Sequence, residues 1–170
     1  MTLDELVSLA NMVAGTGDVA GAIRLYRDWL AREDVVNKYF AWFNLGVMLA
    51  DQGDRESAAD AYRAALADKP SFAQARINLG RLHEDAGRPD DAIHEWLAAL
   101  TLLAEQPEAP ASYTVMTLNN LGVLLKKTGK IEEARAMYER ALAIFERALA
   151  PTHPRLLACQ ANYEKLNRMR

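Results

Sequence analysis

The sequence predicts an all-α protein in which antiparallel helix pairs stack into a solenoid. Three observations indicate this fold. An Asn-Leu-Gly motif occurs three times along the 170 residues. Apolar residues around each motif are spaced three and four apart, which places them on one face of a helix. A glycine-containing turn follows each such stretch before a second helical stretch begins. Repetition with a period of 20–50 residues is typical of solenoids.

The repeats align on the glycine of each motif. Gly46 and Gly80 lie 34 residues apart, and Gly122 follows 42 residues after Gly80. Each glycine is followed, at fixed offsets, by an alanine, an aromatic residue and a second alanine. These residues are Ala58, Tyr62 and Ala65; Ala92, Trp96 and Ala99; and Ala134, Tyr138 and Ala141. A weaker copy comes first, with Ala10 in the glycine position, followed by Ala22, Tyr26 and Trp29.

The alignment predicts four helix pairs and a single C-terminal helix. The repeats cover residues 3–34, 37–70, 71–104 and 112–150, and the terminal helix covers 154–169, so we expect one domain over 1–170. A glycine inside a helix costs about 1 kcal/mol relative to alanine. Recurrence of Gly46 and Gly80 therefore predicts that the partner helix comes close, with Tyr62 or Trp96 filling the adjacent space. Turn glycines are expected at the left-handed position that ends each first helix. They are Gly17, Gly53, Gly87 and Gly129.

The second repeat resembles the tetratricopeptide repeat (TPR). The matching residues are Trp42, Leu45, Gly46, Leu49, Ala58, Tyr62, Ala65 and Pro70, with Leu49 where a tyrosine is usual. The third repeat departs further, because Arg76 and His83 occupy the tryptophan and tyrosine positions; we expect His83 to be a packed core residue. Repeats 2 and 3 resemble those of O-GlcNAc transferase and SPINDLY-type proteins, and repeat 4 resembles the kinesin light chain type. The resemblance implies a right-handed superhelix with a concave surface lined by the first helix of each pair.

Composition indicates a soluble protein without a nucleic-acid or membrane partner. Hydrophobic residues make up 51% of the chain and charged residues 25%, and the net charge of −3 provides no basic field for nucleic acid or anionic lipid. The acidic N-terminus lacks a long apolar stretch, and the single cysteine, Cys159, suits a reducing compartment. We therefore expect a cytoplasmic protein.

The sequence contains no arrangement typical of an active site. The histidines, His83, His94 and His153, lie in different repeats without a second ligand at metal-binding spacing. Cys159 has no histidine nearby in the sequence, and every glycine is accounted for by a turn or a helix crossing. We therefore expect no enzymatic activity, no metal and no cofactor.

Asparagine recurs on the concave face that the resemblance implies. Asn44, Asn78 and Asn120 all lie two residues before the glycine, and Asn162 takes the same position if the 42-residue register continues. Asparagine costs up to about 0.7 kcal/mol inside a helix, so its repeated use needs a reason. The amide can donate and accept together, which suits pairing with a peptide backbone. The row resembles the asparagine ladder of O-GlcNAc transferases. The alternatives are inheritance from an ancestral repeat and hydrogen bonding to a neighbouring helix.

Other residues are expected on the same face. They are Phe40, Phe43, Ile77, Arg81, Asn119 and Lys127. Phe40 and Phe43 are candidate anchors for an apolar side chain, although Phe40 packing on the first repeat is an equal alternative. Arg81 and Lys127 could bind a carboxylate of a ligand. Alternatively, Lys127 is a solvated residue whose positive charge stabilises the C-terminal end of its helix. TPR proteins that bind chaperone tails hold a carboxylate with basic residues at particular inward positions, an arrangement called a carboxylate clamp. Val7, Phe43 and Met116 occupy lysine positions of this clamp here, so the resemblance to it is partial.

The sequence therefore predicts a non-catalytic protein-interaction module that binds an extended peptide in its groove. Two alternatives stay open. One is the substrate-recognition part of a larger glycosyltransferase-like enzyme. The other is a scaffold that assembles with itself, which would make the protein a homo-oligomer. The expected partner is a protein or peptide.

Overall fold

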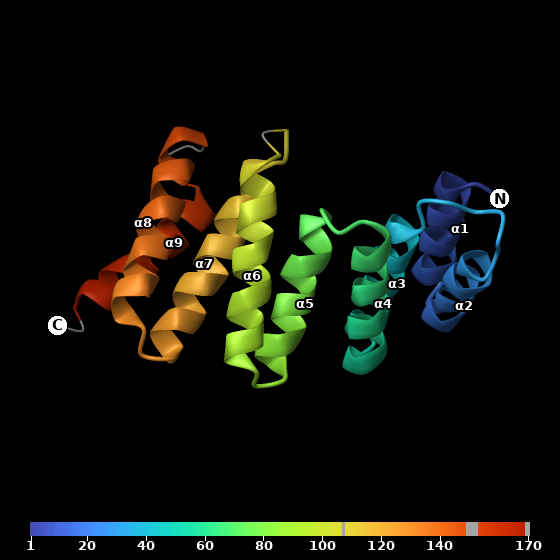
Figure 1. The fold of residues 1–170 in the computed structure, drawn as a ribbon, viewed down its shortest axis with the longest axis horizontal. Helices are drawn as coiled ribbons and strands as arrows, with labels where there is room; N and C mark the ends of the chain where they lie inside the picture. The colour runs from blue at the N-terminus through green and yellow to red at the C-terminus, as the bar shows by residue number, and fades with distance from the viewer. Residues whose placement is uncertain (107, 149–152, 169–170) are drawn as a thin grey trace. The chain divides into compact units, whose positions relative to one another are not determined.

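The computed structural model describes residues 1–106, 108–148 and 153–168, and the secondary structure within them is helical (Figure 1). The helices are α1 (Leu3–Gly15), α2 (Val19–Leu30), α3 (Tyr39–Asp51), α4 (Arg55–Asp68), α5 (Ala73–Asp85), α6 (Pro89–Ala104), α7 (Ala111–Lys127), α8 (Ile131–Ala148) and α9 (Pro154–Asn167). The predicted all-α class is confirmed. The predicted ends of the fourth repeat and of the terminal helix, residues 150 and 169, lie outside the described residues.

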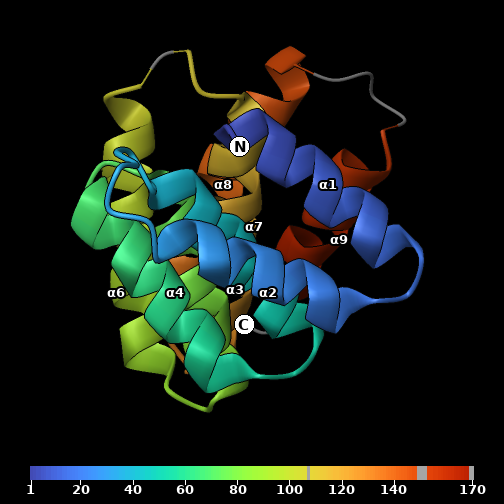
Figure 2. The same cartoon turned by 90° about the vertical axis from the view of Figure 1, so that its right-hand side faces the viewer.

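The chain forms two compact units, Met1–Leu79 and Gly80–Arg170, with the boundary inside α5. In unit 1, α1 contacts α2, α2 contacts α3, and α3 contacts α4. Figure 2 shows α1 and α2 side by side and running in opposite directions. In unit 2, α6 contacts α7, α7 contacts α8, and α9 contacts both α7 and α8. Each unit thus consists of antiparallel neighbours, as expected for stacked helix pairs.

Glycine turns connect the helices of each pair. Gly53 has φ +82° and Gly129 has φ +80°, the left-handed conformation that ends a helix with little strain only in glycine. Aspartates then begin the next helices in unit 1. Asp18 accepts a hydrogen bond from the Gly21 amide and Asp54 accepts one from the Ser57 amide. The predicted turn positions are confirmed.

The aromatic residue of each second helix packs against the helical glycine of its partner. A Cβ atom added to Gly46 would lie 2.6 Å from the Tyr62 ring, one on Gly80 would lie 2.5 Å from Trp96, and one on Gly122 would lie 2.7 Å from Tyr138. Tyr62, Trp96 and Tyr138 are all fully buried. The predicted close approach is confirmed, because an added Cβ atom would overlap the ring at each crossing. His83 is buried as well, which confirms its place in the core.

The side chains of Lys38 and Asp68 cap the helix ends at the junction of α2 and α3. The Lys38 ammonium donates hydrogen bonds to the carbonyl oxygens of Leu30 (2.8 Å) and Arg32, at the C-terminal end of α2. The carboxylate of Asp68, at the end of α4, accepts a 2.6 Å hydrogen bond from the Tyr39 amide, which begins α3. These contacts supply partners for backbone groups that a helix end otherwise leaves unpaired.

The terminal helix α9 is packed onto unit 2. Leu156, Cys159 and Leu166 are buried against the unit 2 core. The Arg135 guanidinium donates to the Asn167 amide oxygen, and the Tyr163 hydroxyl donates to Glu139 at 2.8 Å. These contacts fix α9 to α8. Among the described residues, no helix combines the length and the apolar character needed to cross a bilayer.

Candidate functional site

Two of the recurring asparagines in unit 1 hydrogen-bond a tyrosine of the preceding repeat. The Asn78 amide donates to the Tyr62 hydroxyl at 3.2 Å. Asn44 likewise hydrogen-bonds Tyr26, whose pKa is raised by burial and partly lowered again by this bond. Both asparagines are half-buried. These bonds agree with the alternative that the asparagines link neighbouring helices. Each bond uses only one hydrogen-bonding group of the asparagine amide, which has two N–H groups and an acceptor oxygen.

Unit 2 arranges its asparagines differently. Asn162 of α9 donates to the Asn119 oxygen of α7 at 3.4 Å, so these two predicted site residues lie together. Asn120 is half-buried on α7. The aromatic residue one repeat before Asn120 is Trp96, which has no hydroxyl group and cannot accept the bond that Tyr62 accepts from Asn78. A tyrosine one repeat before the asparagine is thus the sequence feature that predicts an asparagine–tyrosine hydrogen bond.

Unit 1 contains an open cavity of about 180 Å³ beside α1 and α3. Its lining is apolar or uncharged and consists of Val7, Asn11, Tyr26, Phe40, Asn44, Val47 and Met48. Phe40 is 37% exposed at this cavity, and its ring is also 6.3 Å from that of Phe43. Because Val7 and Asn11 belong to the first repeat, Phe40 both lines the open cavity and adjoins that repeat. The structure thus brings Phe40 and Asn44 together.

Phe43 lies in an aromatic cluster of unit 1. Its ring is 5.1 Å from Phe72 in an edge-to-face arrangement and 5.8 Å from Tyr62. Phe43 is therefore half-buried and packs towards the start of the next first helix. Ile77 occupies the same position in the third repeat and is only 3% exposed. The predicted place of Ile77 on an accessible groove face is wrong, because its side chain is buried.

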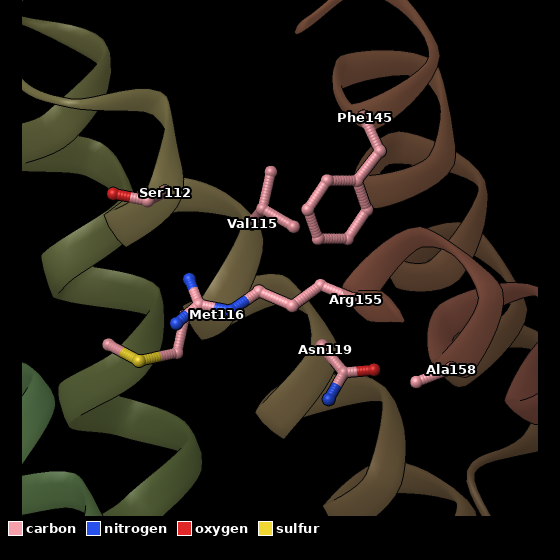
Figure 3. Close-up of a pocket in the computed structure, with 7 residues that line it drawn as sticks. All are labelled: Ser112, Val115, Met116, Asn119, Phe145, Arg155 and Ala158. Carbon is pink, nitrogen blue, oxygen red and sulfur yellow. The ribbon is translucent and has the colours of Figure 1, made fainter. Parts of the chain in front are cut away.

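Unit 2 contains an open cavity of about 220 Å³ between α7, α8 and α9 (Figure 3). The lining residues are Ser112, Val115, Met116, Asn119, Phe145, Arg155 and Ala158. A second cavity of about 100 Å³ adjoins it and shares Ser112, Val115, Phe145 and Arg155. Of the predicted site residues, Asn119 lies at this cavity. Arg155, Ser112 and Phe145 were not identifiable from the repeat register, because they lie at helix ends and in a second helix.

The predicted basic residues have different surroundings. Lys127 forms a 2.8 Å ion pair with Glu84, so its charge is already balanced. Arg81 is exposed on α5. Arg155 is exposed in the first turn of α9, and no carboxylate of the described residues is within ion-pair distance of its guanidinium.

Cys159 lines none of these cavities, whereas Ser112, His153 and Arg155 line the smaller cavity of unit 2. Cys159 is only 1% exposed, and burial raises the pKa of its thiol to about 11. At neutral pH the thiol is protonated and a poor nucleophile. No group of three metal-ligating side chains occurs in the part of the chain that the structure describes. The cavity linings combine apolar side chains with hydrogen-bonding side chains such as Asn44 and Asn119.

The helix pairs and glycine crossings define the class of helical-repeat solenoids. Two family models confirm this class, and both are described as tetratricopeptide repeat. One matches residues 71–147 and 113–170, and the other matches residues 7–71. The chain belongs to the tetratricopeptide repeat family, whose members serve as protein-interaction scaffolds.

Curated relatives share segments of this chain. The peroxisomal targeting signal receptor of Kluyveromyces lactis is 36% identical over 92 residues, which are 54% of this chain and 16% of the receptor. The photosystem I assembly protein Ycf3 of Acaryochloris marina is 37% identical over 65 residues, which are 38% of this chain and 39% of Ycf3. The matches therefore span less than half the length of either relative.

Solved structures show the same fold over nearly the whole chain. BtubC (BKLC) from P. vanneervenii superposes with a TM-score of 0.84 at 21% identity, covering 98% of this chain and 72% of that one. The kinesin light chain TPR-like repeats of Podosopora anserina superpose with a TM-score of 0.75 at 19% identity, covering 98% and 85%. These likenesses establish the TPR solenoid fold and do not identify a ligand.

Proposed function

We propose that the chain is a non-catalytic module that binds an extended peptide along its odd-numbered helices. One observation carries the proposal. In each unit an open apolar cavity lies beside two odd-numbered helices and is lined by asparagine, Asn11 and Asn44 in unit 1 and Asn119 in unit 2. An apolar side chain of a peptide fits such a cavity, while asparagine pairs with its backbone.

The tyrosine contacts of the asparagines support this role. The Tyr62 hydroxyl fixes the orientation of the Asn78 amide, and Tyr26 does the same for Asn44. A side chain that is already ordered loses less conformational entropy when it binds a ligand. The same hydrogen bond can therefore link two helices and prepare the remaining amide groups for a peptide.

Selection from a displayed library of random 12-residue peptides tests the proposal. The dissociation constants of the selected peptides are then measured by fluorescence anisotropy for the wild type, Asn44→Ala and Asn120→Ala. Loss of two hydrogen bonds at about 1 kcal/mol each predicts roughly thirtyfold weaker binding. Circular dichroism confirms that the variants are folded.

Asn78 offers a matched control. Asn78→Ala removes the amide, whereas Tyr62→Phe removes the hydrogen bond to Asn78 and keeps the amide. We expect Asn78→Ala to weaken peptide binding clearly more than Tyr62→Phe does. Equal effects would show that the asparagine acts through packing, and the peptide-ladder role would be abandoned.

Four finer predictions from the sequence stay predictions beside this proposal. They are the likeness of repeats 2 and 3 to O-GlcNAc transferases, a role within a larger enzyme, a cytoplasmic location and self-assembly. Light scattering of the purified chain tests self-assembly directly. A mass above that of the 18.9 kDa monomer would favour the scaffold alternative.

A further inference from the structure

We propose that the cavity between α7, α8 and α9 is the anchor subsite for the bound peptide. It takes a leucine, methionine or phenylalanine side chain, and Arg155 binds the carboxylate of an aspartate or glutamate that follows it in the peptide. The inference rests on the proposed peptide-binding function and adds the chemical class of the ligand. Nothing in the repeat pattern assigns this role to Arg155, because α9 follows the last complete helix pair.

The cavity has the size and lining of an apolar binding site. Its floor includes Val115 and Phe145, both buried, and its rim includes Met116, which is 41% exposed. An apolar cavity of about 150 Å³ accommodates a benzene ring. The open volume of about 220 Å³ here is therefore large enough for a phenylalanine or an aliphatic side chain. An exposed methionine adapts readily to ligands of different shape.

Arg155 lies across the opening of this cavity. Figure 3 shows its side chain extending from α9 towards Met116, with Val115 and Phe145 on one side and Asn119 and Ala158 on the other. Arg155 lines both adjoining cavities. Its guanidinium is always charged and presents parallel N–H groups that match a carboxylate. Because no carboxylate of the described residues pairs with it, this charge is available to a ligand.

The position of Arg155 in its helix is not explained by helix stability. It lies in the first turn of α9, where the helix dipole disfavours a cation. The first turns of α7 and α9 also contain no acidic residue. Ser112, from the first turn of α7, lines the same two cavities as Arg155. The arginine and two helix N-termini therefore favour an anion at this end of the cavity.

The carboxylate is assigned to a side chain and not to a peptide C-terminus. The proposed ligand is an extended segment that continues past the cavity, so its backbone does not end beside Arg155. Arg155 is exposed and within reach of a side chain that points away from the cavity floor. An acidic residue next to the anchoring residue satisfies both conditions.

Three acetylated and amidated octapeptides test the inference. Their central residues are phenylalanine-glutamate, phenylalanine-glutamine and alanine-glutamate, in a serine-glycine background. Methyl NMR of the full chain reports on Val115 and Met116 as each peptide is titrated. We expect shifts at both methyl groups with phenylalanine-glutamate. We expect about fivefold weaker binding when glutamine replaces glutamate, and tenfold or more when alanine replaces phenylalanine.

Variants at the cavity separate the two parts of the subsite. Arg155→Gln is expected to lower the affinity for phenylalanine-glutamate to that for phenylalanine-glutamine, and to leave the second affinity unchanged. Arg140→Gln is the matched control, because Arg140 is also exposed but lines neither cavity. Ala158→Leu should block the cavity while keeping the arginine. Arg155→Glu should prefer a phenylalanine-lysine peptide, which a merely unfolded variant could not do.

The outcomes distinguish this inference from the proposed function. Library peptides that depend on the asparagines, with no shift at Val115 or Met116 and no effect of Arg155→Gln, would leave the proposed function standing and overturn the subsite. Equal binding of the glutamate and glutamine peptides to the wild type would overturn the role of Arg155. Binding only by peptides with a free C-terminal carboxylate would overturn the assignment to a side chain. A library that yields no ligand would overturn the proposed function itself.

Discussion

Two cavities lined by asparagine, the one beside α1 and α3 in unit 1 and the one between α7, α8 and α9 in unit 2, differ in charge and in their asparagine contacts. The unit 1 cavity is lined only by uncharged residues, and Asn44 there is bonded to Tyr26. The unit 2 cavity includes Arg155, and Asn119 there is bonded to Asn162 of α9. The shared glycine and aromatic crossings set the fold, whereas the charge of the unit 2 cavity comes from Arg155, which lies outside the repeat pattern.

The largest effect is expected at the aromatic residues that both units share. Tyr62→Ala in unit 1 and Trp96→Ala in unit 2 each remove a fully buried ring packed on a glycine. Each should lower the free energy of unfolding by about 3–5 kcal/mol. Urea denaturation followed by circular dichroism measures this loss, with Arg140→Ala as an exposed control. A small loss in one unit alone would break the comparison, since the crossings would then not be equivalent.

Alkaline pH is expected to destabilise unit 2 through its buried thiol. Burial raises the pKa of Cys159 from 9.0 to about 11 and that of Tyr138 from 10.0 to about 12, both in unit 2. The unfolded chain loses the thiol proton first as pH rises, while the folded chain keeps it. The contribution of Cys159 to the free energy of unfolding should therefore be constant below pH 8 and fall above pH 9, by about 2–3 kcal/mol by pH 11.

Cys159→Ala is the variant for this pH series. It creates a small cavity whose cost does not depend on pH, and it removes the contribution of the thiol to the alkaline loss. Urea denaturation between pH 7 and pH 10.5 should show a shallower decline than in the wild type. An identical decline would mean that the thiol of Cys159 is not protected in the folded chain.

Helical glycines provide a smaller and sharper test. Gly46→Ala and Gly122→Ala place a Cβ atom 2.6 Å and 2.7 Å from a buried tyrosine ring. Overpacking of about 1–3 kcal/mol exceeds the gain of about 1 kcal/mol in helix propensity, so we expect a net loss near 1 kcal/mol. Gly15→Ala is the control, because nothing lies within 4 Å of its added Cβ. It should stabilise the protein, as measured by thermal unfolding.

The smallest expected effect concerns the tyrosine hydroxyls. Tyr62→Phe removes the hydrogen bond with Asn78 and should cost about 1 kcal/mol. Tyr138→Phe in unit 2 should cost less, because no asparagine is bonded to Tyr138 among the described residues. Urea denaturation measures the free energy of unfolding of both variants. Equal losses would contradict the difference between the units, in which Asn78 is bonded to a tyrosine and Asn119 is bonded to Asn162.

Local pattern was sufficient to predict the helices, the turns and the glycine crossings. A missing side chain at Gly46 and a large one at Tyr62 are complementary in the sequence itself, so their contact is predictable without coordinates. The left-handed glycines follow from the same reasoning, because few other residues tolerate that conformation.

The cavities could be predicted only in part. The repeat register placed Asn44 and Asn119 on helices that line the cavities. It also placed Ile77 on an accessible face, but Ile77 is buried in the structure. Arg155 was not predictable as a cavity residue, because its position depends on how α9 packs on α7 and α8. That packing is set by contacts such as Tyr163 with Glu139, which lie far apart in the sequence.

The caps at the junction of α2 and α3 bear on how such repeats could be exchanged during evolution. Lys38 caps the C-terminal end of α2, the helix before it. Asp68, at the C-terminal end of α4, caps the start of α3. A recombination event between residues 32 and 38 would separate Lys38 from the carbonyl groups it binds. An inserted repeat would therefore need its own lysine at this position, so the unit of inheritance here includes the connecting segment along with the helix pair.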